Sequence, residues 1–283
     1  MCGPCPQGQD AYSQLMADVV LRGGRLSYNL VGSQEAGGLP FVWGHGLTSS
    51  RADEDMMPLI DSAVIAERRQ VVRYDARGHG LSSDLSAPAD GDWAALARDQ
   101  IGLIDHLGWG DALLGGASMG TATALHAALL LGDRVRGLVL VIPPTAWETR
   151  AAQVDLYEQM AAAVERDGTG VLEAGARATP PPNPFAEDDS WLDRRLHVLG
   201  AADPKRLVAI FRGAGTADLP LPEDLATIAA PTLVLAWSGD PGHPVSTAKR
   251  LGALLPNSDV VISSTREDLD TWTSRCASFL DAR

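Results

Sequence analysis

The sequence predicts an α/β fold, with a mostly parallel sheet of eight strands that has helices on both faces. Short apolar runs alternate with helical segments of about ten or more residues, which is the pattern of successive βαβ units. The predicted strands are apolar throughout, as is typical of strands that helices cover on both sides. The strands are predicted at 19–21, 25–31, 40–43, 70–74, 112–114, 138–142, 231–237 and 259–262, and the intervening helices at 54–68, 93–107, 121–131, 246–255 and 267–280.

Turn and capping residues mark where several of these elements begin and end. Arg22-Gly23-Gly24 separates the first two strands and favours a hairpin turn. Asp92 precedes an apolar pattern with helical spacing and is expected to cap the helix over 93–107. Ser264 and Glu267 form a capping box, which predicts that the last helix begins directly after the last strand.

The alternation of strands and helices is interrupted between residues 145 and 227. Helical patterns occur there at 151–166, 191–199 and 204–213, and a proline-rich stretch at 179–184 separates the first two. These patterns do not supply strands for the sheet. We therefore expect residues 1–144 and 228–283 to form the core, with 145–227 inserted after the sixth strand as a helical cap.

Composition and charge exclude several classes of partner. The chain has 283 residues, of which 45% are hydrophobic, and its net charge is −13. This acidity argues against binding to nucleic acid or to an anionic membrane surface. No apolar run reaches the roughly 18–20 residues that a membrane-spanning helix needs, and the first residues lack the pattern of a secretory signal. We therefore expect a cytoplasmic protein whose partner is a small-molecule substrate.

The cysteines do not indicate redox chemistry. Cys2-Gly3-Pro4-Cys5 spells a redox motif, but no strand precedes it and a polar, turn-rich stretch follows. A frayed tail is the better interpretation. With Cys276 the chain has three cysteines, which fits a reducing compartment better than a disulfide framework.

The strongest catalytic signal is Gly116-Ala117-Ser118-Met119-Gly120, a G-x-S-x-G pentapeptide. An apolar strand precedes it and an Ala/Leu-rich helix follows, which is the context of a nucleophilic serine on a sharp turn. Small residues are needed on both sides because such a turn is crowded. Ser118 would then lie at a helix N-terminus, where developing negative charge is stabilised. The alternative interpretation is that Ser118 only caps the helix.

No pattern indicates a metal or a cofactor. The chain has no H-E-x-x-H motif and no histidines at ligand spacing. Its glycines form neither a phosphate loop nor a dinucleotide fingerprint. We therefore expect no metal site and no cofactor.

Nearly the whole chain resembles the α/β-hydrolase family. The resemblance rests on His45-Gly46 after the third strand, on the run from Tyr74 to Ser82 after the fourth, on the pentapeptide after the fifth, and on Gly239-Asp240-Pro241-Gly242-His243-Pro244 near the C-terminal end. The order and spacing of these motifs agree with the family, as does a cap after the sixth strand. The chain looks like the small esterases, lactonases and cofactor-free peroxidase-like members, many of which act on acyl compounds.

The resemblance implies roles for individual residues. Ser118 would be the nucleophile, and Asp240 matches the acid of the family's catalytic triad. The backbone N–H groups of Leu47 and Met119 would form the oxyanion hole. His45 and Gly46 belong to the loop that shapes this site and are expected to contact the substrate.

The resemblance fails at the catalytic base. The family places a histidine in the loop after the last core strand, but this chain has none after His243. His243 follows Asp240 by three residues, and we expect it to be too close along the chain to be oriented by Asp240 and still reach Ser118. His197 in the cap and His45 are the other candidates. His79, His106 and His126 fit turn, surface or half-buried roles better.

Three functions are compatible with this incomplete set of catalytic residues. The first is a serine hydrolase of small apolar esters, thioesters or lactones that uses Ser118 and an oxyanion hole, with a non-standard or absent base. The second is a catalytically impaired protein of the same fold that binds a ligand. The third is a cofactor-free lyase or isomerase whose oxyanion hole stabilises an enolate. The hydrolase ranks first because three of four catalytic elements are present.

Overall fold

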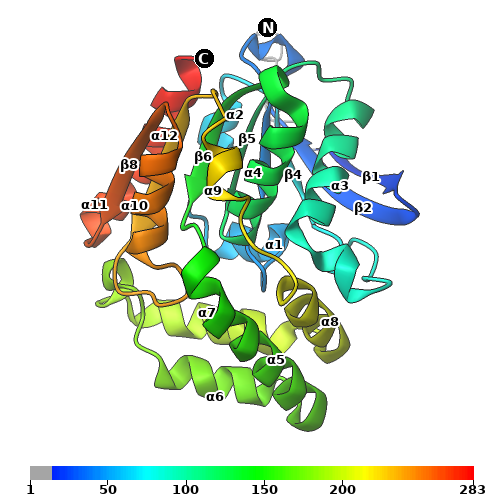
Figure 1. Cartoon of the computed structure of the whole chain (residues 1–283), viewed down its shortest axis with the longest axis vertical. Coiled ribbons are helices and arrows are strands. Elements are labelled where there is room, and N and C mark those ends of the chain that lie inside the picture. Colours follow the sequence, from blue (N-terminus) through cyan, green and yellow to red (C-terminus); the bar gives the residue numbers. More distant parts are fainter. Residues whose placement is uncertain (1–14) are drawn as a thin grey trace, which may run out of the picture.

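The computed structural model describes residues 15–283, so the interpretation of Cys2 to Cys5 lies outside the described residues. Its centre is one eight-stranded sheet in the order β1-β2-β4-β3-β5-β6-β7-β8, in which only β1 and β2 run antiparallel to their neighbours (Figure 1). The strands are β1 (Leu15–Leu21), β2 (Gly24–Val31), β3 (Phe41–Gly44), β4 (Val71–Tyr74), β5 (Ala112–Ala117), β6 (Val135–Val141), β7 (Thr232–Trp237) and β8 (Ser258–Ser263). This confirms the predicted fold class, including the hairpin between β1 and β2.

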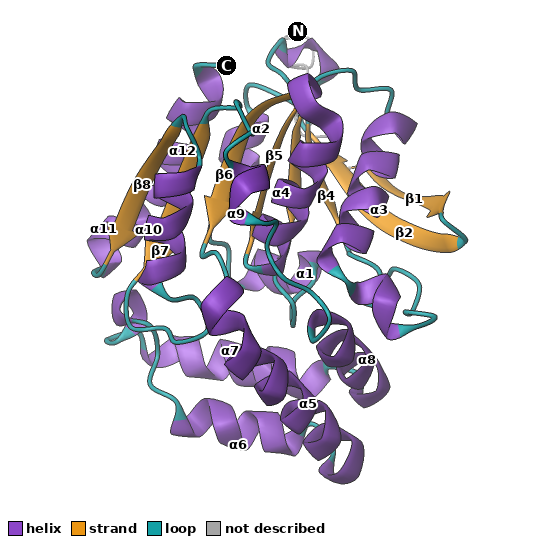
Figure 2. Cartoon of the chain, viewed as in Figure 1, coloured by secondary structure: helices purple, strands orange, loops and turns teal. Residues whose placement is uncertain are grey.

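Helices cover both faces of the sheet (Figure 2). One face packs against α3 (Trp93–His106), α4 (Met119–Leu131) and α10 (Val245–Leu254), and buries side chains such as Trp93 and Leu125. The other face packs against α2 (Ser62–Ala66) and α12 (Trp272–Asp281), with Trp272 fully buried. The predicted cap of α3 is present, since the Asp92 side chain accepts hydrogen bonds from the N–H groups of Ala94 and Ala95.

Two predicted helices are divided in the structure. The segment 54–68 forms α1 (Arg51–Met56) and the separate α2, so the prediction of one helix was wrong. Pro58 explains the break, because a proline disfavours the helical conformation of the residue before it. The last helix is likewise divided into α11 (Arg266–Asp270) and α12. Its capping box uses Thr265 and Asp268, one residue later than predicted.

The segment between β6 and β7 contains four longer helices, here called the cap helices. They are α5 (Arg150–Asp167), α6 (Gly170–Ala178), α7 (Asp189–Ala201) and α8 (Pro204–Ala214). Figure 1 shows them gathered beyond the carboxyl ends of the parallel strands. They share a small apolar cluster of their own that includes Leu172, Leu199 and Phe211. The short helix α9 (Pro222–Leu225) instead packs against the core through Leu225.

Hydrogen bonds and a cation–π contact attach the cap helices to the core. The Arg150 guanidinium stacks on Trp93 of α3 at 4.1 Å and donates to the carbonyl oxygen of Ala217. Arg206 of α8 donates to the carbonyl oxygen of Ser82. Asn183, the first residue of a short 3-10 helix before α7, donates its backbone N–H to the carbonyl oxygen of Ser238, just after β7. The cap is therefore held on both sides of the strand ends that carry the predicted catalytic residues.

Candidate active site

Ser118 lies on a sharp turn between β5 and α4. Its backbone has φ 52° and ψ −108°, a strained conformation that residues with a side chain rarely adopt. The serine occupies the N-cap position of α4, but its side chain makes no capping hydrogen bond. The Ser118 side chain therefore does not cap the helix, contrary to the alternative interpretation of this residue.

Gly116 and Gly120, which flank this turn, must be glycines because their backbone directly contacts the backbone of β3. A Cβ atom added at Gly120 would lie 2.1 Å from the carbonyl oxygen of Gly44 in β3. A Cβ atom at Gly116 would lie 2.6 Å from the same oxygen. The pentapeptide thus packs its backbone against the neighbouring strand, which fixes where Ser118 emerges.

We expect Gly120→Ala to lower the free energy of unfolding by about 3 kcal/mol, because the overlap is with backbone that cannot rotate away. Gly175→Ala in α6 is the matched control, since nothing lies within 4 Å of a Cβ atom at that helical glycine. The control should be neutral or more stable by about 0.5–1 kcal/mol. Thermal unfolding followed by circular dichroism measures both variants, and equal melting temperatures would contradict the steric argument.

The side chain that contacts the Ser118 hydroxyl is His243. His243 Nε2 lies 2.8 Å from Ser118 Oγ, so the hydroxyl can donate its proton to the ring. The same ring donates from Nδ1 to Asp240 Oδ2 at 2.7 Å. The histidine and aspartate side chains are 23% and 18% exposed, which leaves the pair partly open to solvent.

Three hydrogen bonds hold the Asp240 carboxylate. Oδ2 accepts from His243 and from the indole N–H of Trp237 at 2.9 Å, while Oδ1 accepts from the backbone N–H of Gly242 at 2.9 Å. Burial alone raises the pKa of Asp240, but these hydrogen bonds and the charge of His243 outweigh it and hold the pKa well below its usual range. The carboxylate is therefore ionised and oriented towards the imidazole.

The expectation that His243 is too close to Asp240 to serve both partners was wrong. The backbone N–H of His243 donates to the carbonyl oxygen of Asp240 at 3.2 Å, closing a turn through Pro241 and Gly242. The turn brings the two side chains together although they are three residues apart. An Asp-Pro-Gly turn with histidine in the fourth position was the signal that could have identified this residue.

The loop after β8 is short, as expected from the sequence. β8 ends at Ser263, and Thr265 already caps α11. Ser264 between them accepts a 2.9 Å hydrogen bond from the hydroxyl of Ser238, which follows β7. The histidine that contacts Ser118 thus lies in the loop after β7 and not in the loop after β8.

Two backbone N–H groups lie near Ser118 without an internal partner. Within residues 15–283, neither the N–H of Leu47 nor that of Met119 donates a hydrogen bond to another group. Met119 is the first residue of α4. Gly46 lies directly against the serine, since a Cβ atom there would be 3.7 Å from Ser118 Cβ. The loop after β3 and the start of α4 therefore present free donors beside the hydroxyl.

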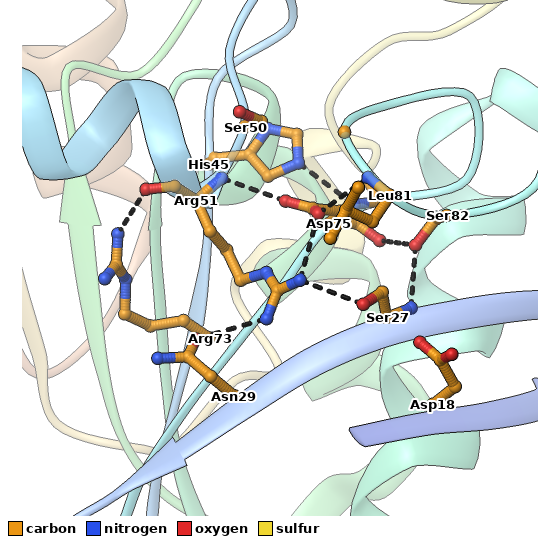
Figure 3. Close-up of polar contacts among 12 residues, drawn as sticks. Asp18, Ser27, Asn29, His45, Ser50, Arg51, Arg73, Asp75, Leu81 and Ser82 are labelled. Atoms are coloured by element: carbon orange, nitrogen blue, oxygen red, sulfur yellow. Dashed lines mark hydrogen bonds and ion pairs between the residues drawn. The ribbon is translucent and has the colours of Figure 1, made fainter. Parts of the chain in front are cut away.

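A buried polar network holds the loop that carries Leu47 (Figure 3). His45 is 1% exposed, and its Nε2 accepts from the N–H of Ala76 at 2.9 Å while Nδ1 donates to the carbonyl oxygen of Gly46. Burial lowers the pKa of His45 to about 3, so the ring is neutral and suited to accept at Nε2. This arrangement does not fit the predicted substrate contact or a catalytic base, since both nitrogens are engaged with backbone.

Two further side chains of the network hold the same loop. His79 Nε2 lies 2.5 Å from the carbonyl oxygen of Leu47, which the ring can bind as a donor. Asp75 accepts from the backbone N–H of Arg51 at 2.9 Å and from its guanidinium at 3.1 Å (Figure 3). His79 and Asp75, which belong to the sequence motif after the fourth strand, thus hold the loop that carries Leu47 in place.

Among residues 15–283, none of the remaining histidines forms a hydrogen bond with Ser118. His197 lies in α7 and is exposed. His126 of α4 is half-buried and contacts the carbonyl oxygen of Asp218 at 2.9 Å, and His106 is exposed beside Tyr28. The surface or half-buried positions expected of His106 and His126 are confirmed.

Neither a metal centre nor a membrane span emerges from the described part of the chain. Among residues 15–283, no three histidine, cysteine or acidic side chains are grouped as ligands. Over the same range, no helix combines the length and the apolar character needed to cross a bilayer.

The mostly parallel sheet and the serine on its sharp turn between β5 and α4 define a protein of the hydrolase type within the α/β class. The chain belongs to the alpha/beta hydrolase fold family, whose model matches residues 40–269. This confirms the resemblance drawn from the sequence motifs.

Named relatives and a solved structure agree with the family. The putative carbamate hydrolase RutD of Caulobacter sp. is 31% identical over 209 residues, covering 70% of this chain and 74% of that protein. A crystal structure of a hydrolase from Pseudomonas aeruginosa PA01 superimposes with a TM-score of 0.79 at 26% identity, covering 94% of this chain and 98% of that one. An acetyltransferase component of the acetoin cleaving system of Pseudomonas putida is 33% identical, but the match spans 49% of this chain and only 33% of that protein.

Proposed function

We propose that this chain is a serine hydrolase that cleaves small, largely apolar carboxylic esters, thioesters or lactones. The observation that carries the proposal is the unbroken series of hydrogen bonds from Ser118 through His243 to Asp240. A serine hydroxyl is a weak nucleophile unless a base lies within hydrogen-bond reach. His243 is a candidate base at that distance, and Asp240 fixes the tautomer with a free Nε2.

In the proposed reaction, Ser118 Oγ attacks the carbonyl carbon of the substrate while its proton passes to His243 Nε2. The N–H groups of Leu47 and Met119 stabilise the oxyanion of the tetrahedral intermediate. His243 then returns the proton to the leaving alcohol or thiol, and an acyl-serine remains. Water repeats the sequence, with His243 again as base, and releases the acid and the free serine.

Two other functions were considered from the sequence. The ligand-binding protein with an impaired site was motivated by the missing histidine, and His243 supplies a candidate base for the hydrolase, which removes that motivation. The lyase or isomerase needs a different base, for which the sequence offers no clear candidate. No other contact within residues 15–283 favours either alternative, so the hydrolase stands alone as the proposal.

A fluorophosphonate probe tests the proposed nucleophile directly. We expect intact-protein mass spectrometry to find a single phosphonyl group, and peptide mapping to place it on Ser118. Ser118→Ala should stay unlabelled, while Ser274→Ala, which removes an exposed serine of α12, should label like the wild type. Hydrolysis of p-nitrophenyl butyrate should follow the same order. An unlabelled wild type that also leaves the ester intact would reject the proposal.

A further inference from the structure

The cap helix α7 carries side chains that reach towards the catalytic residues of the core. Trp191 and Leu192 pack against the apolar cluster beneath the sheet, and Leu192 also packs against the cluster shared by the cap helices. Leu196 and Leu199 face that second cluster. The first turn of α7 is therefore the part of the cap that bridges to the core.

A series of aromatic contacts leads from α7 to the Asp240 carboxylate. The Trp191 ring lies 6.0 Å from that of Phe185, and the Phe185 ring lies edge-on to Trp237 at 5.5 Å. Trp237 donates to Asp240 and stands edge-on to the His243 ring at 6.2 Å. Packed aromatic side chains therefore connect Trp191 to the Asp240 carboxylate.

Arg195 is such a group. Its guanidinium lies over the Trp191 ring at 5.6 Å, one helical turn further along α7. The surrounding protein lowers the pKa of Arg195, while the negative charge of Asp240 acts in the opposite direction. The guanidinium stays protonated because its ordinary pKa is so high. Its charge is thus within electrostatic reach of the proposed triad.

This positive charge has no partner inside the protein. Arg195 is exposed and makes neither a hydrogen bond nor an ion pair with any residue from 15 to 283, and the oxygens of Asp240 are already engaged with Trp237, His243 and Gly242. Its neighbour Arg194 is different, since it donates to Asp188 at 2.8 Å. A guanidinium without a protein partner can form two parallel hydrogen bonds with a carboxylate, and it is a local positive charge in a chain of net charge −13.

We propose that Arg195 binds a negatively charged group of the substrate, so that the preferred substrates are esters that also carry a carboxylate separated from the scissile carbonyl by an apolar chain. The inference rests on the proposed hydrolase function and specifies that the substrate has a negatively charged end.

The test compares matched esters with and without the charge. The charged substrates are the p-nitrophenyl monoesters of adipic and suberic acids, and the neutral ones are the corresponding methyl p-nitrophenyl diesters. We expect the wild type to prefer the charged ester about tenfold or more in kcat/KM, mainly through KM, and the preference to decrease with added salt. Arg195→Gln should lose this preference without losing activity on the neutral esters, and Arg195→Lys should keep part of it.

Arg194→Gln is the matched control, because it removes a neighbouring charge that is already paired. It should retain the wild-type preference. A wild type that hydrolyses both esters equally, or an Arg195→Gln variant with an unchanged preference, would overturn the inference while leaving the proposed function intact.

A direct binding measurement covers the case in which the wild type hydrolyses none of these esters. That outcome counts against the proposed function, and quenching of tryptophan fluorescence by monomethyl and dimethyl adipate then tests Arg195 alone. Tighter binding of the monoanion by wild type than by Arg195→Gln supports the inference. Equal binding by the two proteins rejects it.

Discussion

Replacing His243 with glutamine is expected to reduce kcat for ester hydrolysis by about 10⁴- to 10⁶-fold, because the serine loses the only ring within hydrogen-bond reach of its hydroxyl among the described residues. The loss corresponds to about 5–8 kcal/mol of transition-state stabilisation. KM should change little, since His243 contributes to the transition state more than to ground-state binding. Steady-state kinetics with p-nitrophenyl butyrate measure both parameters.

His197→Gln is the control for this prediction. His197 is the cap histidine that the sequence left as an alternative base, and it is exposed on α7. Its replacement should leave kcat within about twofold of the wild type, since surface substitutions away from a site usually have small effects. If His197→Gln lost activity and His243→Gln kept it, the proposed triad would be incorrect. Circular dichroism verifies that both variants are folded.

Replacing Asp240 with asparagine is expected to reduce kcat by about 10³- to 10⁴-fold. An asparagine amide can donate to His243 Nδ1, which favours the tautomer with the proton on Nε2, facing Ser118. The ring then cannot accept the serine proton. Gly242 keeps the amide oxygen as its acceptor, so the turn should remain folded, whereas the indole N–H of Trp237 loses the oxygen that it shares with His243.

The control is Asp259→Asn, which changes an exposed carboxylate on β8 and should leave kcat unaltered. The pKa of Asp240 is held well below its usual range, so its carboxylate is ionised throughout the neutral range and the deficit of Asp240→Asn should be similar at pH 6 and pH 8.

The lowered pKa of Asp240 also determines the direction in which the stability of the fold changes with pH. A carboxyl group whose pKa is lower in the folded state stabilises the fold above its unfolded-state pKa, and the contribution disappears as the pH falls through the folded-state value. The stability difference between wild type and Asp240→Asn should therefore diminish as the pH falls below about 4. A difference that grows on acidification would contradict the hydrogen bonding of Asp240.

Much of the fold follows from local patterns. Apolar runs separated by helical segments predict the parallel sheet, and the glycines around Ser118 predict a tight turn that the positive φ of this residue matches. Local signals also account for the errors of detail. Pro58 divides the helix expected over 54–68, and Thr265 instead of Ser264 caps α11.

The candidate site was only partly predictable. Ser118 and Asp240 each lie at the end of a strand, where the parallel arrangement brings side chains to one edge of the sheet. His45 belongs to the predicted loop, but its ring turns inward to bind Ala76 and Gly46, which the motif alone does not reveal. Side-chain direction depends on the packing of neighbouring segments, so a motif can locate a residue without locating its functional group.

The sequence by itself determined the serine turn, the order of the strands along the chain and the short connection after β8. Only the tertiary structure decided that His243 stands between Ser118 and Asp240. The reason is geometric: a histidine three residues after an aspartate reaches the serine only if the Asp-Pro-Gly turn closes and β5 and β7 hold their ends at the right separation. That separation is set by β6, which pairs with both strands and whose position no local pattern encodes.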